Sequence, residues 1–178
     1  MVQTLKIIKR ETFLPLIAIL CLLFAISSAS AATNVSGTIS SDTTWTLADS
    51  PFVLEGTVTV STGVTLTLQP GVVVKGNYNP SYSSVLLVNG TLVADGTAAQ
   101  PIVFTSFRDD SFGGDTNGDG SATVPAKGDW IGLAFYGSST GNVLDNVVVR
   151  YGGYWYGNAN RNIYTNTSGL AISASSPW

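Results

Sequence analysis

Short stretches of alternating apolar and polar residues fill the chain from about residue 52 onward, and glycine, proline, asparagine or aspartate separates them. One phrase, Gly56–Val60, reads Gly-Thr-Val-Thr-Val, and Gly90–Ala94 repeats it as Gly-Thr-Leu-Val-Ala. Successive side chains of a β-strand point to opposite faces, so this alternation predicts short strands with one apolar face. Related phrases that recur along a chain are typical of a stacked β-solenoid.

The spacing of these phrases predicts at least three coils. The first runs from Phe52 to Gly76, the second from Val85 to Ser106, and the third begins at Trp130. When the polar inserts 77–84 and 107–128 are set aside, each repeat has the length of one turn of a three-sided parallel solenoid. A β-sandwich is the alternative, because short strands with turns also predict that fold. The repeated phrases favour the solenoid.

The alternation also assigns side chains to the interior of each coil. No segment shows a sustained helical period, so all of these assignments use the strand period. The predicted inward residues are Val58, Val60, Leu66, Leu68, Val72 and Val74 in the first coil, Leu86, Val88, Leu92, Ala94, Ile102 and Phe104 in the second, and Ile131, Leu133, Phe135, Val147, Val149 and Tyr151 in the third.

The first 31 residues have a different composition from the coils. Three basic residues open this segment, an uncharged apolar run follows over 13–26, and small residues end it at 29–31. This is the pattern of a secretory signal peptide spanning residues 1–31. The apolar run is short for a membrane span, which needs about 20 residues, and an uncleaved anchor is the alternative. We therefore expect a secreted or cell-surface protein with no stable membrane insertion after cleavage.

Residues 32–51 precede the first coil and are expected to form an N-terminal cap. A solenoid end exposes apolar side chains and unpaired backbone groups, so it needs a cover. Trp45 is the candidate lid over that end.

The charge balance beyond the leader is acidic. The chain has 8 Lys and Arg residues against 11 Asp and Glu residues, and the leader contains three of the cations but only one acid. An acidic chain with few, scattered cations is not expected to bind nucleic acid. The single cysteine lies in the leader, so no disulfide is expected within the coils.

Three phrases together resemble a known family. They are Gly63–Gly76, Gly90–Ser106 and Gly128–Gly132, the last of which reads Gly-Asp-Trp-Ile-Gly. From Val35 to Gly153 the chain is similar to secreted right-handed parallel β-helix proteins of the pectate-lyase-like superfamily in the broad sense. The resemblance implies an all-β, right-handed parallel β-helix of about three to four coils. It implies less about activity, because that superfamily includes lyases, hydrolases, adhesins and inert surface repeats.

Residues 52–178 are assigned to this β-helix. The segment from Asn166 to Trp178 reads like the beginning of a fourth coil, and nothing in the sequence caps it. We therefore expect the sequence to be an N-terminal fragment of a longer protein.

The loop from Arg108 to Asp129 is the candidate for specific chemistry. Its segment 115–120 reads Asp-Thr-Asn-Gly-Asp-Gly and matches the opening of a calcium loop, D-x-[DN]-x-[DN]-G. Alternate residues of such a loop bring oxygen atoms to one point, as Ca²⁺ requires. The usual closing Glu is absent, so Asp129, Asp110 or water would complete the sphere, and an ordinary acidic turn is the alternative. The predicted metal ligands are Asp115, Asn117, Asp119, Ser121 through its carbonyl, and Asp129.

A second cluster is aromatic and spans residues 151–164, with four tyrosines and one tryptophan among glycines. Tyr and Trp present a flat apolar face and a polar edge, which suits sugar rings or peptides. The alternative is that these rings pack against the flank of the solenoid. The predicted ligand-binding residues are Tyr154, Trp155 and Tyr156, to which Tyr78 and Tyr82 of the earlier insert could add.

No catalytic constellation is visible in the sequence. The chain has no His, which excludes His-based triads and His metal sites. Polysaccharide lyases on parallel β-helices use an Arg or Lys base beside acidic calcium ligands, but no spacing links Arg150 or Arg161 to an acidic pair. We therefore expect a non-catalytic module that presents loops for adhesion or for binding a polysaccharide or cell-surface glycan. The alternative is the N-terminal part of a polysaccharide lyase or hydrolase whose active coils lie beyond residue 178.

Overall fold

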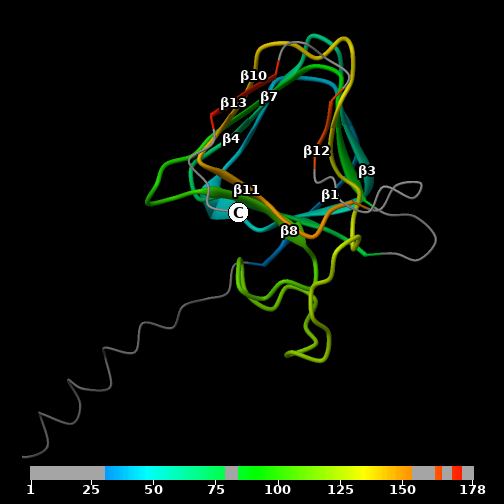
Figure 1. Ribbon diagram of the computed structural model, residues 1–178, viewed down its shortest axis with the longest axis vertical. Coiled ribbons are helices and arrows are strands. Elements are labelled where there is room, and N and C mark those ends of the chain that lie inside the picture. Colours follow the sequence, from blue (N-terminus) through cyan, green and yellow to red (C-terminus); the bar gives the residue numbers. More distant parts are fainter. Residues whose placement is uncertain (1–30, 79–83, 154–162, 166–169, 174–178) are drawn as a thin grey trace, which may run out of the picture.

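The chain folds into a three-sided parallel β-helix, seen end-on as a triangle in Figure 1. The computed structural model describes residues 31–78, 84–153, 163–165 and 170–173. Every strand pair in these residues is parallel, which confirms the predicted all-β solenoid and excludes a β-sandwich. Within the same residues, no helix has the length and apolar character needed to cross a membrane.

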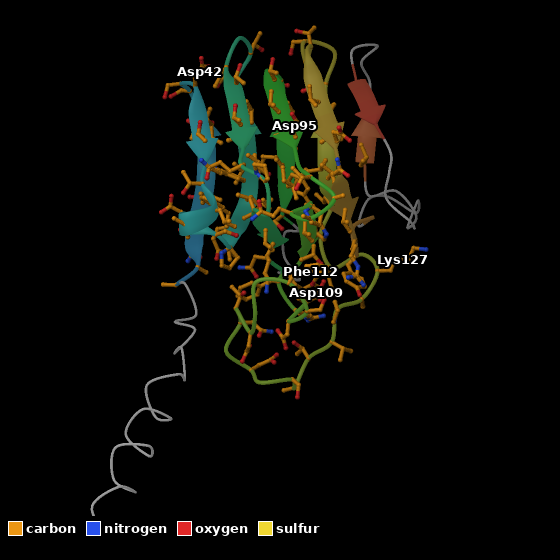
Figure 2. All side chains as sticks on the ribbon, turned by 90° about the vertical axis from the view of Figure 1, so that its left-hand side faces the viewer. Asp42, Asp95, Asp109, Phe112 and Lys127 are labelled. Carbon is orange, nitrogen blue, oxygen red and sulfur yellow. The ribbon has the colours of Figure 1, made fainter. Side chains whose placement is uncertain are left out.

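Each turn of the β-helix, here called a rung, contributes one strand segment to each of three faces. The rungs stack in chain order, as the side view in Figure 2 shows. The first face holds the opening halves of β1 (Thr33–Ile39) and β3 (Phe52–Val60), then β5 (Val73–Gly76), β8 (Ile102–Ser106) and β11 (Val147–Val149). The second face holds the closing halves of β1 and β3, then β6 (Val85–Val88), β9 (Gly132–Phe135) and β12 (Ile163–Thr165). The third face holds β2 (Thr43–Trp45), β4 (Thr65–Leu68), β7 (Thr91–Asp95), β10 (Asn142–Asp145) and β13 (Leu170–Ser173).

The strands β1 and β3 turn the corner between the first and second faces without a loop. Each has a glycine at the bend, Gly37 with φ of 75° and Gly56 with φ of 81°. Residues with a Cβ rarely adopt a positive φ, so glycine lets a continuous strand bend there. In later rungs, loops replace this bend.

The interior consists of ladders of apolar side chains in register. Val58 pairs with Leu86, which pairs with Leu133, and Val74 pairs with Phe104 in the same way. All of the inward residues predicted for the first two coils are buried, which confirms those assignments. Equivalent strands of successive rungs therefore stack on one another, and each rung shields the apolar side chains of its neighbours from water.

The third coil departs from the prediction at its corner. Leu133 and Phe135 are buried, and Val147 and Val149 pack against the core, but Ile131 and Tyr151 are not part of it. The strict alternation fails there because both residues lie in the connection between the first and second faces. Trp130 enters the core instead and is completely buried.

Residues 32–51 were expected to form a cap. In the structure they form the first rung of the stack, with strands on the same faces as the later rungs. Its strand β1 pairs with β3, and β2 pairs with β4. A short 3₁₀ turn, η2 (Leu47–Asp49), connects this rung to the next. Trp45, the candidate lid, is buried and stacks on Phe52 with ring centroids 4.6 Å apart. Trp45 is thus part of the buried core at this end of the stack.

Loops connect the first and second faces in the last three rungs, and the loop of the fourth rung is the longest. They comprise residues 77–84 in the third rung, 107–131 in the fourth and 150–162 in the fifth, and we call them the corner loops. Backbone hydrogen bonds join successive corners: the amide of Phe107 donates to Gly76, and that of Gly153 donates to Ile131. All three corner loops therefore emerge from one edge of the triangular stack.

The long corner loop, 107–131, folds over the outer surface of the first face. Val53, Val73 and Val103 point outward there, yet all three are buried. Lys75 is also buried beneath this loop, and its Nζ donates a hydrogen bond to the Gly114 carbonyl at 2.7 Å. The first face is thus buried on both sides, unlike the half-buried pattern that alternation alone predicts.

Candidate functional site at one corner

The corner loops bring the chemistry-bearing residues of the sequence together. The acidic segment 115–120 lies within the long corner loop, and Tyr78 belongs to the preceding corner loop. Tyr154, Trp155 and Tyr156 lie outside the described residues, as does Tyr82, but the described residues that flank them belong to the same corner. This edge of the β-helix is therefore the candidate functional site.

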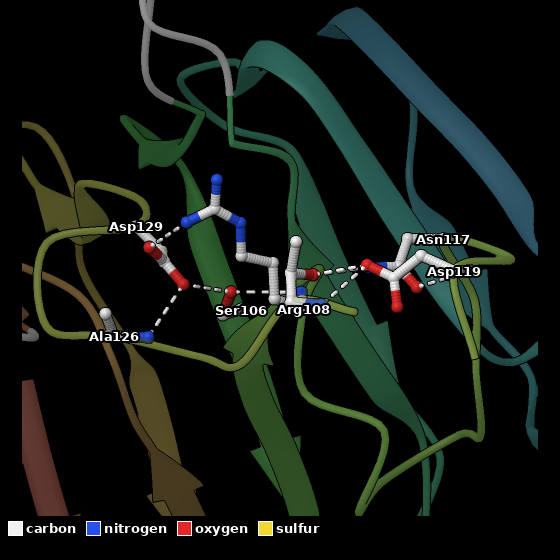
Figure 3. Close-up of polar contacts among 7 residues, drawn as sticks. Ser106, Arg108, Asn117, Asp119, Ala126 and Asp129 are labelled. Atoms are coloured by element: carbon white, nitrogen blue, oxygen red, sulfur yellow. Dashed lines mark hydrogen bonds and ion pairs between the residues drawn. The ribbon is translucent and has the colours of Figure 1, made fainter. Parts of the chain in front are cut away.

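Asp129 lies at the base of the long corner loop and is almost fully buried, with 3% of its surface exposed. One of its carboxylate oxygens, Oδ2, accepts hydrogen bonds from the Ser106 hydroxyl at 2.6 Å and the Ala126 amide at 2.9 Å. The other, Oδ1, pairs with Nη1 of Arg108 at 3.2 Å. Figure 3 shows this group on one side of the loop and Asn117 with Asp119 on the other. Asp129 thus anchors the base of the loop, and it is not among the three carboxylates that lie within 4.8 Å of one another, those of Asp110, Asp115 and Asp119.

Asp109 forms a second buried anchor for the long corner loop. The hydroxyls of Thr105 and Ser111 donate hydrogen bonds to its carboxylate. Arg150, from the next corner loop, places Nη1 at 3.8 Å from the same carboxylate. The two anchors tie the long corner loop to β8 and to the following rung.

The segment 115–120 closes on itself through its carboxylates. Asp115 accepts hydrogen bonds from the amide of Asp119 at 3.1 Å and from that of Gly120 at 2.8 Å. Asp119 accepts one from the Ala122 amide at 3.1 Å. Its other oxygen accepts from the amide and hydroxyl of Thr123. The turn predicted from the D-x-N-x-D-G pattern is therefore held by backbone donors.

Asp110 joins this turn, and the side chain of Asn117 contacts Asp119 through both its oxygen, which accepts from the Asp119 amide at 3.4 Å, and its amide group. One carboxylate oxygen each from Asp110, Asp115 and Asp119 lies within 4.8 Å of the others. Asn117 Nδ2 donates to Asp119 Oδ2 at 2.9 Å. Ser121 is exposed, and its amide donates to the Asp119 carbonyl at 3.0 Å.

Lys75 is a buried cation beside these carboxylates, and nothing in the sequence marked it. Burial lowers the pKa of its ammonium group from the ordinary 10.5, while the charges of Asp110, Asp109 and Asp115 oppose that shift. It stands at an outward position of β5, where a Lys is usually a solvated surface residue. Only the loop that covers the first face makes it part of the site.

Arginine and aromatic side chains meet on the same corner. The guanidinium of Arg108 lies 3.9 Å from the ring centroid of Tyr78, which is 38% exposed. That of Arg150 lies 5.5 Å from the Phe112 ring and 4.9 Å from the Tyr151 ring. Such contacts hold flat rings and their cations in fixed positions. The sequence could have indicated this grouping, because each corner loop directly follows a strand of the first face.

Comparison with known families identifies the fold. The family described as "Pectate-lyase like beta helix domain" matches residues 37–170, and the chain belongs to this family. No curated protein and no solved structure shows a significant match to the chain.

Proposed function

We propose that this chain is a secreted or cell-surface β-helix module that presents its corner loops for adhesion or glycan binding, and that it performs no catalysis within these residues. The observation that carries the proposal is that the described ends of all three corner loops lie at one edge of the stack. A rigid solenoid that extends loops from one edge provides an elongated surface for a polymeric partner.

The surface chemistry of this edge supports a glycan as the partner. Tyr78 is exposed, and Arg108 holds its ring from one side. A flat ring with fixed orientation can stack against the apolar face of a sugar, and nearby arginine and aspartate side chains can bind hydroxyl groups. Tyr154, Trp155 and Tyr156 follow in the last corner loop and would extend this surface.

A glycan-array screen of the chain, with and without CaCl₂, tests the proposal. We expect binding to a restricted set of polysaccharides, weakened about tenfold or more by Tyr78→Ala or Trp155→Ala. Tyr136→Ala is the matched control, because Tyr136 is 43% exposed at a different corner of the stack. Absence of binding to any glycan, or an equal loss in the control, would contradict the proposal.

A polysaccharide lyase or hydrolase is the second candidate, and Lys75 is the observation that favours it. A lysine with a lowered pKa beside carboxylates resembles the pairing of a base with acidic metal ligands. The loop that contains Gly114 covers this lysine, however, so a substrate would need the loop to open before reaching it. Release of reducing ends from a polysaccharide by the chain, lost in Lys75→Met, would replace the non-catalytic proposal.

A further inference from the structure

We propose that Asp110, Asp115 and Asp119 form a binding site for a divalent cation, with Ca²⁺ as the expected ion. One carboxylate oxygen from each residue lies within 4.8 Å of the other two. Oxygen atoms bound to one Ca²⁺ at about 2.3–2.6 Å are at most about 5 Å apart, so a single ion can contact all three. Asp110 is one of the closing ligands that the sequence left open, beside Asp129 and water. This inference is independent of glycan binding.

Asp110 provides an observation that points to a missing ligand. Its Oδ1 atom is buried and lacks a hydrogen-bond partner, the one such side-chain atom in the described part of the chain. Buried polar atoms of native proteins almost always have partners, and an exception calls for an explanation such as an ion. A cation among the three carboxylates would supply that partner.

The other two carboxylates are oriented as metal ligands usually are. Asp115 and Asp119 each accept hydrogen bonds from backbone amides, which fix the direction of their oxygens. Each oxygen of Asp115, and Oδ1 of Asp119, accepts a single one of these bonds and keeps a second lone pair for a metal ion. Outer hydrogen bonds of this kind position ligands and reduce the rearrangement that metal binding requires.

The charges of the site also fit a dication. Asp110, Asp115 and Asp119 bring three negative charges, and the ammonium group of Lys75, whose charged form Asp110, Asp109 and Asp115 favour, brings one positive charge. The excess of two negative charges would be balanced by one divalent ion. Oxygen ligands of this type select hard cations such as Ca²⁺ or Mg²⁺ over softer metals.

Calorimetric titration of the whole chain with CaCl₂ and with MgCl₂ tests the proposal, together with thermal melting in CaCl₂ and in EDTA. We expect Ca²⁺ to bind with a dissociation constant of roughly 10⁻⁴–10⁻³ M, the range of extracellular modules. By mass action, CaCl₂ at about 10 mM should then raise the melting temperature by about 3–10 °C. No binding heat and no shift in melting temperature at this concentration would overturn the proposal.

The variant Asp110→Asn distinguishes a metal-binding role of Asp110 from a structural role. Its unpartnered oxygen has no hydrogen bond to lose, and the lost attraction to Lys75 is offset by the lost repulsion from Asp115 and Asp119, so we expect the variant to melt close to the native chain in EDTA. Its affinity for Ca²⁺ should fall about tenfold or more, because ligand charge sets affinity. Asp95→Asn removes an exposed carboxylate of the third face and should leave Ca²⁺ binding unchanged. A lower melting temperature of Asp110→Asn in EDTA with unchanged Ca²⁺ affinity would assign Asp110 a structural role and overturn the proposal.

Discussion

In the stacked rungs, Leu86 packs in register between Val58 and Leu133, and neighbouring apolar side chains repeat this arrangement from rung to rung. The long corner loop, by contrast, is anchored by Asp109 and Asp129, whose carboxylates accept hydrogen bonds from side chains of β8. The first region is stabilised by apolar burial, which needs no particular partner beyond a similar shape. The second depends on individual donors and acceptors, so single polar substitutions should act locally there.

The largest expected effect lies in the stacked rungs. Phe104 is completely buried between Val74 and Val149 of the adjacent rungs. Phe104→Ala should lower the free energy of unfolding by about 3–5 kcal/mol, because it removes apolar contacts and leaves a cavity. Urea denaturation followed by circular dichroism measures this. A loss below about 1 kcal/mol would mean that the rungs are not stabilised by close packing.

An alanine at Gly76 tests whether the junction of the two regions is packed as tightly as the rungs. A Cβ at this position would lie 2.5 Å from the Cβ and Cγ atoms of Trp130, which is completely buried. Gly76→Ala should therefore cost about 1–3 kcal/mol through overpacking. Unfolding in urea gives the value, and an unchanged midpoint would show that Trp130 can move.

Removal of the Asp129 charge should affect the long corner loop more than the rungs. Asp129→Asn weakens the contacts with Ser106, Ala126 and Arg108, and we expect a loss of about 1–3 kcal/mol. Amide hydrogen exchange should rise within 107–131 while β4 and β7 keep their protection. Equal increases in both regions would contradict a local role for this anchor.

The smallest expected effect is the pH dependence due to Lys75. Because burial lowers its pKa in the folded chain below the ordinary 10.5, the unfolded chain binds more protons between these two pKa values. Stability should therefore rise with pH across this window and become level above 10.5. Lys75→Met should lack this rise. Urea midpoints measured at a series of alkaline pH values compare the two proteins, and parallel curves would contradict the assignment.

The rungs were predictable from the sequence because their side chains obey a local rule. Alternation places Leu66 inside and Thr65 outside wherever the strand lies, and the parallel stack then follows from the repeated phrases. The same rule does not account for Lys75, which points outward yet is buried beneath the long corner loop. Whether an outward residue meets water depends on a segment elsewhere in the chain, which periodicity does not encode.

The site was predictable only in part for a similar reason. The D-x-N-x-D-G pattern is local, and the turn formed by Asp115 and Asp119 agrees with it. The approach of Asp110 and Lys75 depends on how the loop folds back over β5, a contact between distant segments. Asp129 follows the acidic turn closely in sequence, but its hydrogen bonds with Ser106 draw it to the base of the loop.

The corner between the first and second faces tolerates insertions without a change of strand register. The rungs on either side of the long corner loop remain paired, with Gly76 opposite Ser106 before the loop and Val85 opposite Gly132 after it. Doubling the length of a flexible loop adds only about 0.6 kcal/mol of closure entropy, so the scaffold is affected little by what is inserted. Protein engineers could therefore graft foreign peptides at this corner, several in a row on successive rungs, and display them as a regularly spaced array.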